Sequence, residues 1–489
     1  MLLHLLVLAP FAVALLMVAT SGFDSKSTSR IAILFGAIFT ALSIRLITVG
    51  YAATSPIEWF TLPGTSTTLY YSLISQGINV WMVFLSTTVS LIALIAARES
   101  FGNNYKNFAI GIFALLGAMN GTFLASDAVL FFFFFEAMVV PAAILIAAYG
   151  GKDRKAAAMN FAIYTLAGSA PMAIALWYLL SVGTGSSAGH LFMAYQGVSA
   201  PIQTLLFVSF ALAFLVKTPL FPFHGWQAQA YAEAPAPLSA VLAGAMSKAG
   251  VYGFFFWVLP IFGSDSSMMN LMMWIGLFTA VYGALMALRA TDAKKLLAFS
   301  SMGHLGLAIA AIFSLSPTMI PAVLVLLVAH GLSSSSQFIL TGVAERFAES
   351  RELKKMGGLA ARNPVFGFLF GFACIAALAV PGTAGFIGEF LILLSLWQVG
   401  PVPAILAGLC LILSAVYMLR FIQAVIFGKA DKVETRPCHK ISPFDAAAVG
   451  VLLLLLVVFG VRPALIMDSL NGATQAEVVA DMEDSEDVF

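Results

Sequence analysis

Six ionisable side chains occur within stretches of sequence that are otherwise almost entirely apolar. They are Glu136, Lys217, Lys248, His304, His330 and Glu389. Carboxyl, amine and imidazole groups all exchange protons, and histidine does so near neutral pH. Ionisable groups at membrane depth are costly, and they usually mark an ion or proton pathway. The residue types therefore predict a line of proton carriers.

No second kind of chemistry is visible in the sequence. The six residues match no metal-ligand, nucleotide-loop or nucleophile-triad spacing. Cys374, Cys410 and Cys438 lie too far apart for an iron–sulfur motif or a disulfide framework. We therefore expect no cofactor, no metal ion and no redox site on this chain.

Glu136 follows five phenylalanines in the segment FFFFFEAMVVP. A lone carboxylate in such surroundings takes up a proton or pairs with a cation. Lys217 is its natural partner, either in a switching pair for proton transfer or in a structural ion pair. Lys248 follows without an evident counter-charge. His304 and His330 could be satisfied core residues, although Ser333–Ser336 and Gln337 favour a hydrated polar track.

The stretch around Lys217 begins and ends as apolar helix but is interrupted by prolines in between. It reads VKTPLFPFHGWQAQAYAEAPAPLSAVLAGAMSKAGVYG, and a second interruption, LAVPGTAGFIGEFLIL, precedes Glu389. Non-helical backbone at membrane depth persists only where protein or a water-filled cavity surrounds it. Broken helices beside buried charge are typical of transporter cores, and a re-entrant loop with a structural salt bridge is the alternative.

The amino-acid composition indicates which class of protein contains these six ionisable residues. Hydrophobic residues make up 61% of the 489-residue chain and charged residues only 10%, against about 25% charged in soluble domains. The net charge of +1 gives no footprint for nucleic acid. We therefore predict an all-α, multi-pass membrane protein without a soluble domain.

Apolar stretches long enough to span a bilayer recur about fourteen times. They are expected at 1–20, 31–50, 76–97, 108–125, 127–149, 156–182, 201–234 (broken), 238–260, 267–289, 296–315, 318–344, 364–397 (broken), 401–427 and 444–466. Of the 24 Lys and Arg residues, 19 fall in the odd-numbered loops and none in the even-numbered loops. The positive-inside rule then places the odd loops in the cytoplasm and both termini outside.

The two interruptions fall in the seventh and twelfth spans, five spans apart. Matching interruptions indicate two related five-helix units, and an odd number of helices inverts the second unit relative to the first. The predicted divisions are 1–107 (helices 1–3), 108–260 (helices 4–8), 261–427 (helices 9–13) and 428–489 (helix 14 and an acidic tail).

The interrupted stretch around Lys217 and the segment with Glu136 resemble the signatures of the antiporter-like subunits of respiratory complex I. The resemblance covers roughly residues 70–465, and the same family includes subunits of Mrp-type cation/proton antiporters and membrane-bound hydrogenases. VPGTAGFIGEF resembles the subunit M branch, the counterpart of mitochondrial subunit 4, which carries glutamate where the sister subunits usually carry lysine. At residues 75–77 the chain has Ser-Gln-Gly where the family often has an aspartate before the glycine, so a peripheral acid is missing.

The resemblance implies a role for each of the six residues. Glu136 would modulate Lys217, the switching lysine, and Lys248 would be the connecting lysine. His304 and His330 would belong to a central hydrophilic axis, and Glu389 would be the terminal group linked to the outside. It also implies fourteen helices with broken helices seven and twelve.

We therefore expect a proton-translocating membrane subunit of a complex I-type NADH (or other donor):quinone oxidoreductase, a translocase whose redox sites lie in other subunits. Its partners would be neighbouring antiporter-like subunits and the lipid of a cell inner (plasma) membrane, with no nucleic acid. The alternatives are a subunit of an Mrp-type sodium/proton antiporter or of a membrane-bound hydrogenase, a stand-alone solute transporter, and a structural scaffold. A scaffold does not explain the buried ionisable groups. The sequence leaves open the electron donor, the quinone and the coupling ion.

Overall fold

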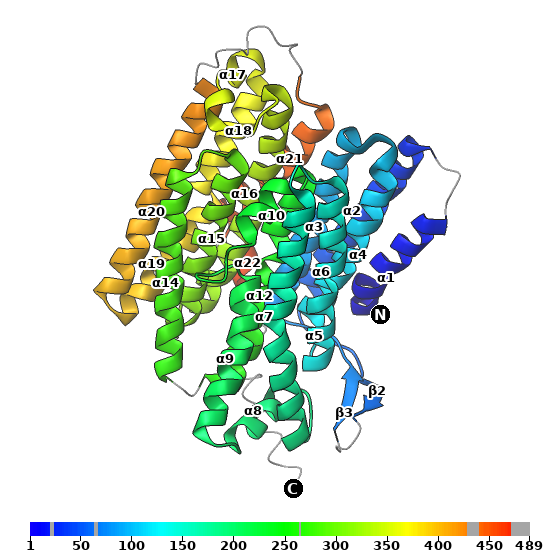
Figure 1. Cartoon of the computed structure of the whole chain (residues 1–489), viewed down its shortest axis with the longest axis vertical. Coiled ribbons are helices and arrows are strands. Elements are labelled where there is room, and N and C mark those ends of the chain that lie inside the picture. Colours follow the sequence, from blue (N-terminus) through cyan, green and yellow to red (C-terminus); the bar gives the residue numbers. More distant parts are fainter. Residues whose placement is uncertain (20–23, 63–66, 264–265, 428–439, 471–489) are drawn as a thin grey trace.

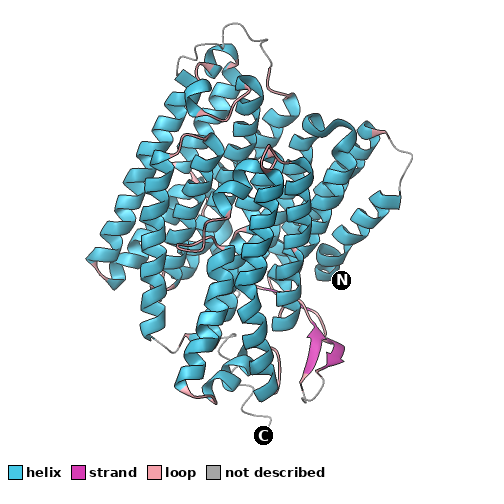
Figure 2. Cartoon of the chain, in the orientation of Figure 1, coloured by secondary structure: helices cyan, strands magenta, loops and turns pink. Residues whose placement is uncertain are grey.

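The computed structural model describes residues 1–19, 24–62, 67–263, 266–427 and 440–470. Most of this part of the chain is helical, and the long helices run side by side (Figure 1, Figure 2). Among the described residues, twelve helical segments are long and apolar enough to cross a membrane. One of these, Ile78–Leu124, has 47 residues and contains two successive helices. The predicted helical, multi-pass architecture is confirmed, whereas the count of fourteen spans stays a prediction.

The N-terminal part joins four long helices to two strand pairs that the sequence did not predict. The helices are α1 (Leu2–Ala19), α2 (Ser25–Val49), α3 (Ile78–Phe101), the short η1 (Gly102–Asn104) and α4 (Tyr105–Leu124). The strands are β1 (Ala52–Ala53), β2 (Ile57–Thr61), β3 (Thr68–Tyr71) and β4 (Ile74–Ser75). β1 pairs with β4 and β2 with β3, both antiparallel. Thr, Tyr, Trp and Phe in this connection favour extended backbone, and the larger pair projects beyond the helices (Figure 2).

The next part of the chain contains the first predicted interruption. It consists of α5 (Ala128–Ala137), α6 (Val139–Tyr149), α7 (Arg154–Val182), α8 (Ala188–Gln196), α9 (Ala200–Lys217), α10 (Gln227–Glu233), α11 (Ala236–Val241), η2 (Leu242–Met246), α12 (Lys248–Gly253), η3 (Phe254–Val258) and α13 (Leu259–Phe262). The Asp127 carboxylate caps α5 by accepting from the backbone N–H groups of Val129 and Leu130 at 2.8 and 3.0 Å. The chain leaves the helix after Lys217, as the prolines there predict.

The remaining part contains the second interruption and packs closely against the first. It consists of α14 (Ser266–Arg289), α15 (Ala293–Ile312), α16 (Met319–Ala348), η4 (Leu353–Lys355), α17 (Leu359–Arg362), α18 (Pro364–Ala377), α19 (Ala384–Val399), α20 (Pro401–Ile422), η5 (Gln423–Phe427), α21 (Pro443–Val461), α22 (Ala464–Met467) and η7 (Asp468–Leu470). A Cβ at Gly276 would lie 2.6 Å from the backbone N of Ala310, so only glycine lets α14 and α15 approach this closely. The predicted acidic tail and Cys438 lie outside the described residues.

Candidate proton-transfer site

Lys217 is the last residue of α9 and its side chain is buried. Its ammonium donates a hydrogen bond to the carbonyl oxygen of Phe135 at 3.0 Å and lies 4.5 Å from the centre of the Phe135 ring. The C-terminal end of a helix and the face of an aromatic ring both attract a cation. Lys217 is therefore held against the end of α5 without a carboxylate.

Glu136 lies directly after Phe135, at the end of α5. Both of its carboxylate oxygens are buried, and neither has a hydrogen-bond partner in the described part of the chain. It lies close enough to Lys217 and Ser169 to interact with them electrostatically. Among the described residues, however, no ion pair of 4.0 Å or less joins Glu136 to Lys217. The structural ion pair that the sequence left open is therefore not formed, and the two groups are neighbours that do not touch.

Lys248 lies at a change in helix geometry. The segment η2 before it is a π-helix, in which the backbone N–H of Ser247 donates to Leu242 at 3.0 Å. Such segments are rare and occur often at functional sites. The Lys248 ammonium is completely buried and donates to the carbonyl oxygen of Ala243 at 2.5 Å. The irregular backbone thus supplies the acceptor that a buried lysine needs.

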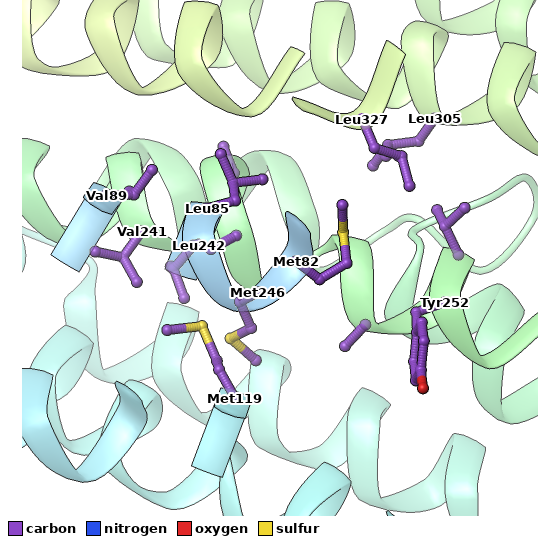
Figure 3. Close-up of a cluster of buried hydrophobic side chains, with 14 of the residues drawn as sticks. Met82, Leu85, Val89, Met119, Val241, Leu242, Met246, Tyr252, Leu305 and Leu327 are labelled. Atoms are coloured by element: carbon purple, nitrogen blue, oxygen red, sulfur yellow. The ribbon is translucent and has the colours of Figure 1, made fainter. Parts of the chain in front are cut away.

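An apolar shell surrounds this region of the bundle. Figure 3 shows buried side chains that come from α3, α4, η2 and its flanking helices, α15 and α16. Those labelled there are Met82, Leu85, Val89, Met119, Val241, Leu242, Met246, Tyr252, Leu305 and Leu327. Water and charge have few favourable positions in such a shell. Protons would therefore be confined to the few polar groups within it.

The structure brings His304, His330 and Glu389 together from α15, α16 and α19. The Nε2 atom of His304 lies 3.2 Å from Oε1 of Glu389, and the two imidazole rings are stacked with centroids 5.0 Å apart. Ser301 lies 3.0 Å from Nε2 of His330. A cavity of about 10 Å³ borders all three residues, which is room for about one water molecule. Ser333 also lines it, so this end of the site is polar.

A close helix contact places Glu389 in this cluster. A Cβ at Gly388 would lie 2.8 Å from the backbone of Leu326, so the glycine lets α19 approach α16. Glu389 is the next residue and is buried at this contact. Any side chain at position 388 would push the carboxylate away from His304.

The six predicted residues thus form two groups. Glu136 and Lys217 are neighbours on α5 and α9. Lys248 lies close enough to His304 and His330 to interact with both electrostatically, and Glu389 completes that group. No direct contact joins Lys217 to Lys248 among the interactions recorded for the described residues. Proton transfer between the groups would need a mobile side chain or bound water.

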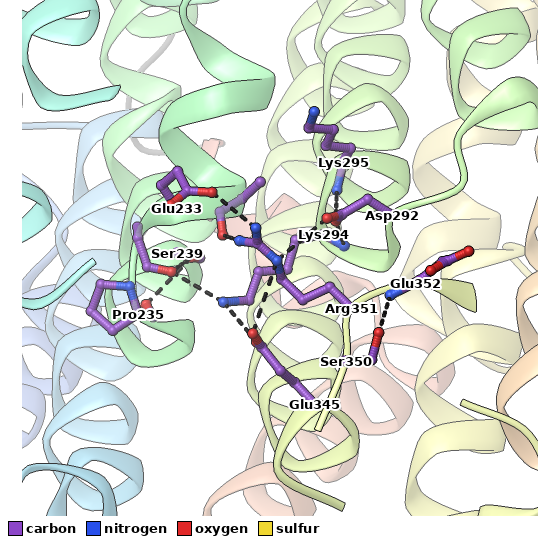
Figure 4. A network of polar contacts seen from close by, with 12 residues as sticks. Glu233, Pro235, Ser239, Asp292, Lys294, Lys295, Glu345, Ser350, Arg351 and Glu352 are labelled. Carbon is purple, nitrogen blue, oxygen red and sulfur yellow. Dashed lines mark hydrogen bonds and ion pairs between the residues drawn. The ribbon is translucent and has the colours of Figure 1, made fainter. Parts of the chain in front are cut away.

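Sequence reasoning missed a cluster of charges at the end of α10 (Figure 4). Arg351 lies 2.9 Å from Glu233, 3.4 Å from Asp292 and 3.9 Å from Glu345. Lys294 lies 3.1 Å from Glu345. Burial disfavours the charged form of Arg351, but the hydrogen bond to Glu233 and the three acidic charges outweigh it, so its pKa lies above the ordinary value. We name Glu233, Asp292, Lys294, Glu345 and Arg351 the charge cluster.

The charge cluster holds the end of the broken helix. Arg351 donates to the carbonyl oxygen of Ala232, and Lys294 donates to that of Ala234 at 3.1 Å. Carbonyl groups at a helix end have no partner within the helix, and that of Ala234 also accepts from the hydroxyl of Ser239 at 3.1 Å. Glu233 also accepts from the backbone N–H of Asp153 at 2.9 Å. The only signal in the sequence was Glu233 within the interrupted stretch, since the other members read as ordinary loop or helix-end charges.

Cys374 and Cys410 are buried free thiols, and no group of three potential metal ligands occurs in residues 1–19, 24–62, 67–263, 266–427 and 440–470. The prediction of no cofactor on this chain is not tested by this and stays a prediction.

The fold and the site together define a helical membrane protein with a buried line of ionisable groups and two broken helices. Comparison with known proteins agrees with that class. Residues 125–414 match the family model described as NADH:quinone oxidoreductase/Mrp antiporter, TM. The chain belongs to this family.

Two relatives by sequence are NADH-quinone oxidoreductase subunit M proteins. The one from Escherichia coli (strain K12) is 33% identical over 494 residues, covering 97% of both chains. The one from Rhodobacter capsulatus is 33% identical over 423 residues, covering 84% of this chain and 82% of its own. These matches confirm the predicted resemblance to the subunit M branch.

Solved structures agree at the level of the fold. A chain of respiratory complex I from Thermus thermophilus with bound NADH matches with a TM-score of 0.86 and 27% identity, covering 99% of both chains. A chain of the Mrp complex from Dietzia sp. DQ12-45-1b matches with a TM-score of 0.86 at 18% identity. The second likeness shows the fold alone, so it does not separate the two functions.

Proposed function

We propose that this chain is a proton-translocating membrane subunit of a complex I-type quinone oxidoreductase. Other subunits of that assembly would carry the redox sites, and neighbouring antiporter-like subunits would be the partners. The observation that carries the proposal is the buried contact of 3.2 Å between His304 and Glu389, with His330 stacked on His304. A carboxylate and two imidazoles at such distances can pass a proton in either direction. An apolar scaffold has no need of them.

Glu136 and Lys217 would form the switch that starts proton transfer. When Glu136 moves toward Lys217, the carboxylate stabilises the protonated lysine, and when it withdraws, desolvation favours proton release. Glu136 has no partner in the described part of the chain, and Lys217 is bonded only to a carbonyl oxygen among the contacts recorded for it. Both groups are therefore free to change partners without breaking an ion pair.

The released proton would travel through the second group. Lys248 receives it, and the positive charge of Lys248 then acts on His304 and His330, which lie close to it. Repulsion between like charges drives the proton onward to Glu389. Glu389 would pass it to the outer water, because α19 begins at a break in the helix where water can enter.

Contacts among the connections support the sidedness that the basic residues predict. Odd-numbered loops contact one another: Ser25 donates to Gly102, and Ser442 donates to Glu99. Even-numbered loops also contact one another: Ser186 donates to Asp127, and Thr67 donates to the carbonyl oxygen of Gly183. These contacts support one side for the Lys- and Arg-rich loops and the other side for the rest.

Two contacts support placing both ends of the described chain on the side with few basic residues. His4 lies 3.4 Å from the hydroxyl of Tyr71, and Trp81 donates to Ser469 at 2.7 Å. We therefore propose a plasma-membrane protein with both termini outside. We also propose the division into residues 1–107, two inverted units at 108–260 and 261–427, and a last helix with the acidic tail at 428–489.

The test is proton uptake by membrane vesicles that contain the assembled complex. Electron transfer to quinone should drive uptake, and the uptake should disappear when Lys217 is replaced by alanine in an assembled complex. Vesicles without an electron donor but with a sodium gradient serve as the comparison. Sodium/proton exchange under that condition, with no uptake coupled to electron transfer, would assign the chain to the antiporter branch instead.

A further inference from the structure

An apolar groove lies between α19 and α20, on the outside of the helix bundle. Its volume is about 390 Å³, and the residues that line it include Phe390, Leu393, Trp397, Ala404, Ile405 and Gly408. Phe390 and Trp397 are 56% and 61% exposed, and α20 lies at an edge of the molecule (Figure 1). Because every residue that lines the groove is apolar, the groove suits an apolar occupant.

Small residues keep the groove open on the side of α20. A Cβ at Gly408 would meet no described atom within 4 Å, and Ala404, one helical turn earlier, has only a methyl group. Small residues four positions apart let a neighbour approach the backbone of a membrane helix closely. The segment Pro401–Phe427 is long and apolar enough to cross a membrane, so the groove opens toward the hydrocarbon region of the bilayer.

The depth of the groove matches one leaflet of a bilayer. α19 ends at Val399 and α20 begins at Pro401, so Gly400 makes the turn between them. Phe390 lies ten residues before Gly400, and Gly408 lies eight residues after it. At about 1.5 Å per residue the groove extends roughly 12–15 Å from the turn. That is about half of a hydrocarbon core of about 30 Å.

The volume of the groove fits one acyl chain better than a helix. A helix of about 10 Å diameter occupies roughly 1,000 Å³ over the same length, more than twice the volume of the groove. A methylene group takes up about as much space as a water molecule in the liquid, roughly 30 Å³, so the groove holds about 13 of them. Trp397 lies near the turn, and tryptophan is enriched where the hydrocarbon region meets water.

We propose that the groove between α19 and α20 binds one acyl chain of a membrane phospholipid. The chain comes from the leaflet on the side of Gly400, which is the outer leaflet in the proposed topology. It enters beside Trp397 and ends near Phe390 and Gly408. Residues 395–405 include no charged residue that would select a headgroup, so the site recognises the tail. Phe390 directly follows Glu389, so the bound chain packs on the helix that carries the last of the six ionisable residues.

The test uses the assembled complex in vesicles of phosphatidylethanolamine and phosphatidylglycerol. A small share of the phosphatidylethanolamine carries a photoreactive diazirine in the middle of one acyl chain. After illumination and proteolysis, mass spectrometry measures the lipid adducts on each helix. Adducts on residues 390–408 should exceed those on other exposed apolar helix faces, such as α7 around Ile174, by about fivefold, because buried apolar area strengthens lipid binding.

Gly408→Leu fills the groove and is the decisive variant. Since a Cβ at position 408 meets no described atom within 4 Å, assembly should be unchanged, and native gel electrophoresis checks this. Adducts on residues 390–408 should fall to the level found on α7. Gly450→Leu in α21 is the matched control, because a Cβ there also meets no described atom within 4 Å. It should leave the adducts on residues 390–408 unchanged.

Two results would overturn the inference: wild-type adducts on residues 390–408 at the level of α7, or unchanged adducts in the assembled Gly408→Leu complex. If Gly408→Leu does not assemble, a structure of the wild-type complex in lipid decides. An acyl chain between Trp397 and Gly408 would support the inference, and a helix of another subunit there, or no chain, would overturn it. The adducts form without electron transfer or proton uptake, so this test is independent of the proposed function.

Discussion

Replacing Glu389 by glutamine should slow proton transfer from His304 to the outer water. The carboxylate lies 3.2 Å from Nε2 of His304, and both side chains are buried. The attraction between protonated His304 and ionised Glu389 at that distance is about 5 kcal/mol at an effective dielectric constant of about 20. Glutamine keeps the shape and one hydrogen bond, so the loss concerns the charge rather than the packing.

The expected effect on the rate follows from that attraction. In the glutamine variant, protonated His304 loses this stabilisation. If about half of the attraction, roughly 2.5 kcal/mol, is added to the barrier for protonation of His304, pumping should slow by roughly 70-fold. Quinone reduction should fall with it, because the two processes are coupled. The assay is quinone reduction and proton uptake in membrane vesicles, with assembly checked by native gel electrophoresis.

Glu58→Gln is the control. Glu58 is exposed on β2, so this substitution makes the same chemical change away from the six buried ionisable residues. It should leave both rates at the wild-type level. An assembled Glu389→Gln complex with wild-type quinone reduction and proton uptake would refute the reasoning.

Three further substitutions test other parts of the account. Glu136→Gln should cut pumping by about 100-fold and Glu136→Asp by less, whereas normal pumping by an assembled Glu136→Gln complex would exclude the switch. Lys248→Arg should lose proton uptake as completely as Lys248→Ala, because arginine does not release its proton, and wild-type uptake would show that positive charge alone suffices. Arg351→Ala should lower the stability of the subunit by about 3 kcal/mol, because it removes the cation paired with buried Glu233. Thermal unfolding of the complex measures this, with exposed Lys354→Ala as the control, and an unchanged midpoint would contradict it.

Much of the arrangement could be predicted from the sequence. Proline cannot continue a helix, so Pro219 and Pro222 mark the end of α9 at Lys217 without knowledge of the fold. Apolar length identified most of the helices, and Glu389 could be recognised as a buried ionisable residue directly after the second interruption. The distance to His304 in particular depends on the close approach of α19 and α16, which only the folded chain shows.

Three features could not be predicted, because each depends on contacts that form only in the folded chain. The π-helix before Lys248 lies in LAGAMSKAG, which contains no residue that marks a change of hydrogen-bond register. The charge cluster joins three connections that are far apart in the sequence, so its members read as ordinary charges. The contact of Lys217 with the carbonyl oxygen of Phe135, rather than with Glu136, depends on rotamers that no pattern encodes.

Proton uptake by an assembled Lys217→Ala complex tests the central claim most directly. Lys217 is the only one of the six residues that lies at the break in the helix and beside Glu136, so its amine cannot be replaced by another member of the line. The account predicts normal assembly, loss of proton uptake and a corresponding loss of quinone reduction. Proton uptake at the wild-type ratio to electrons transferred, in a complex that contains the Lys217→Ala subunit, would contradict it.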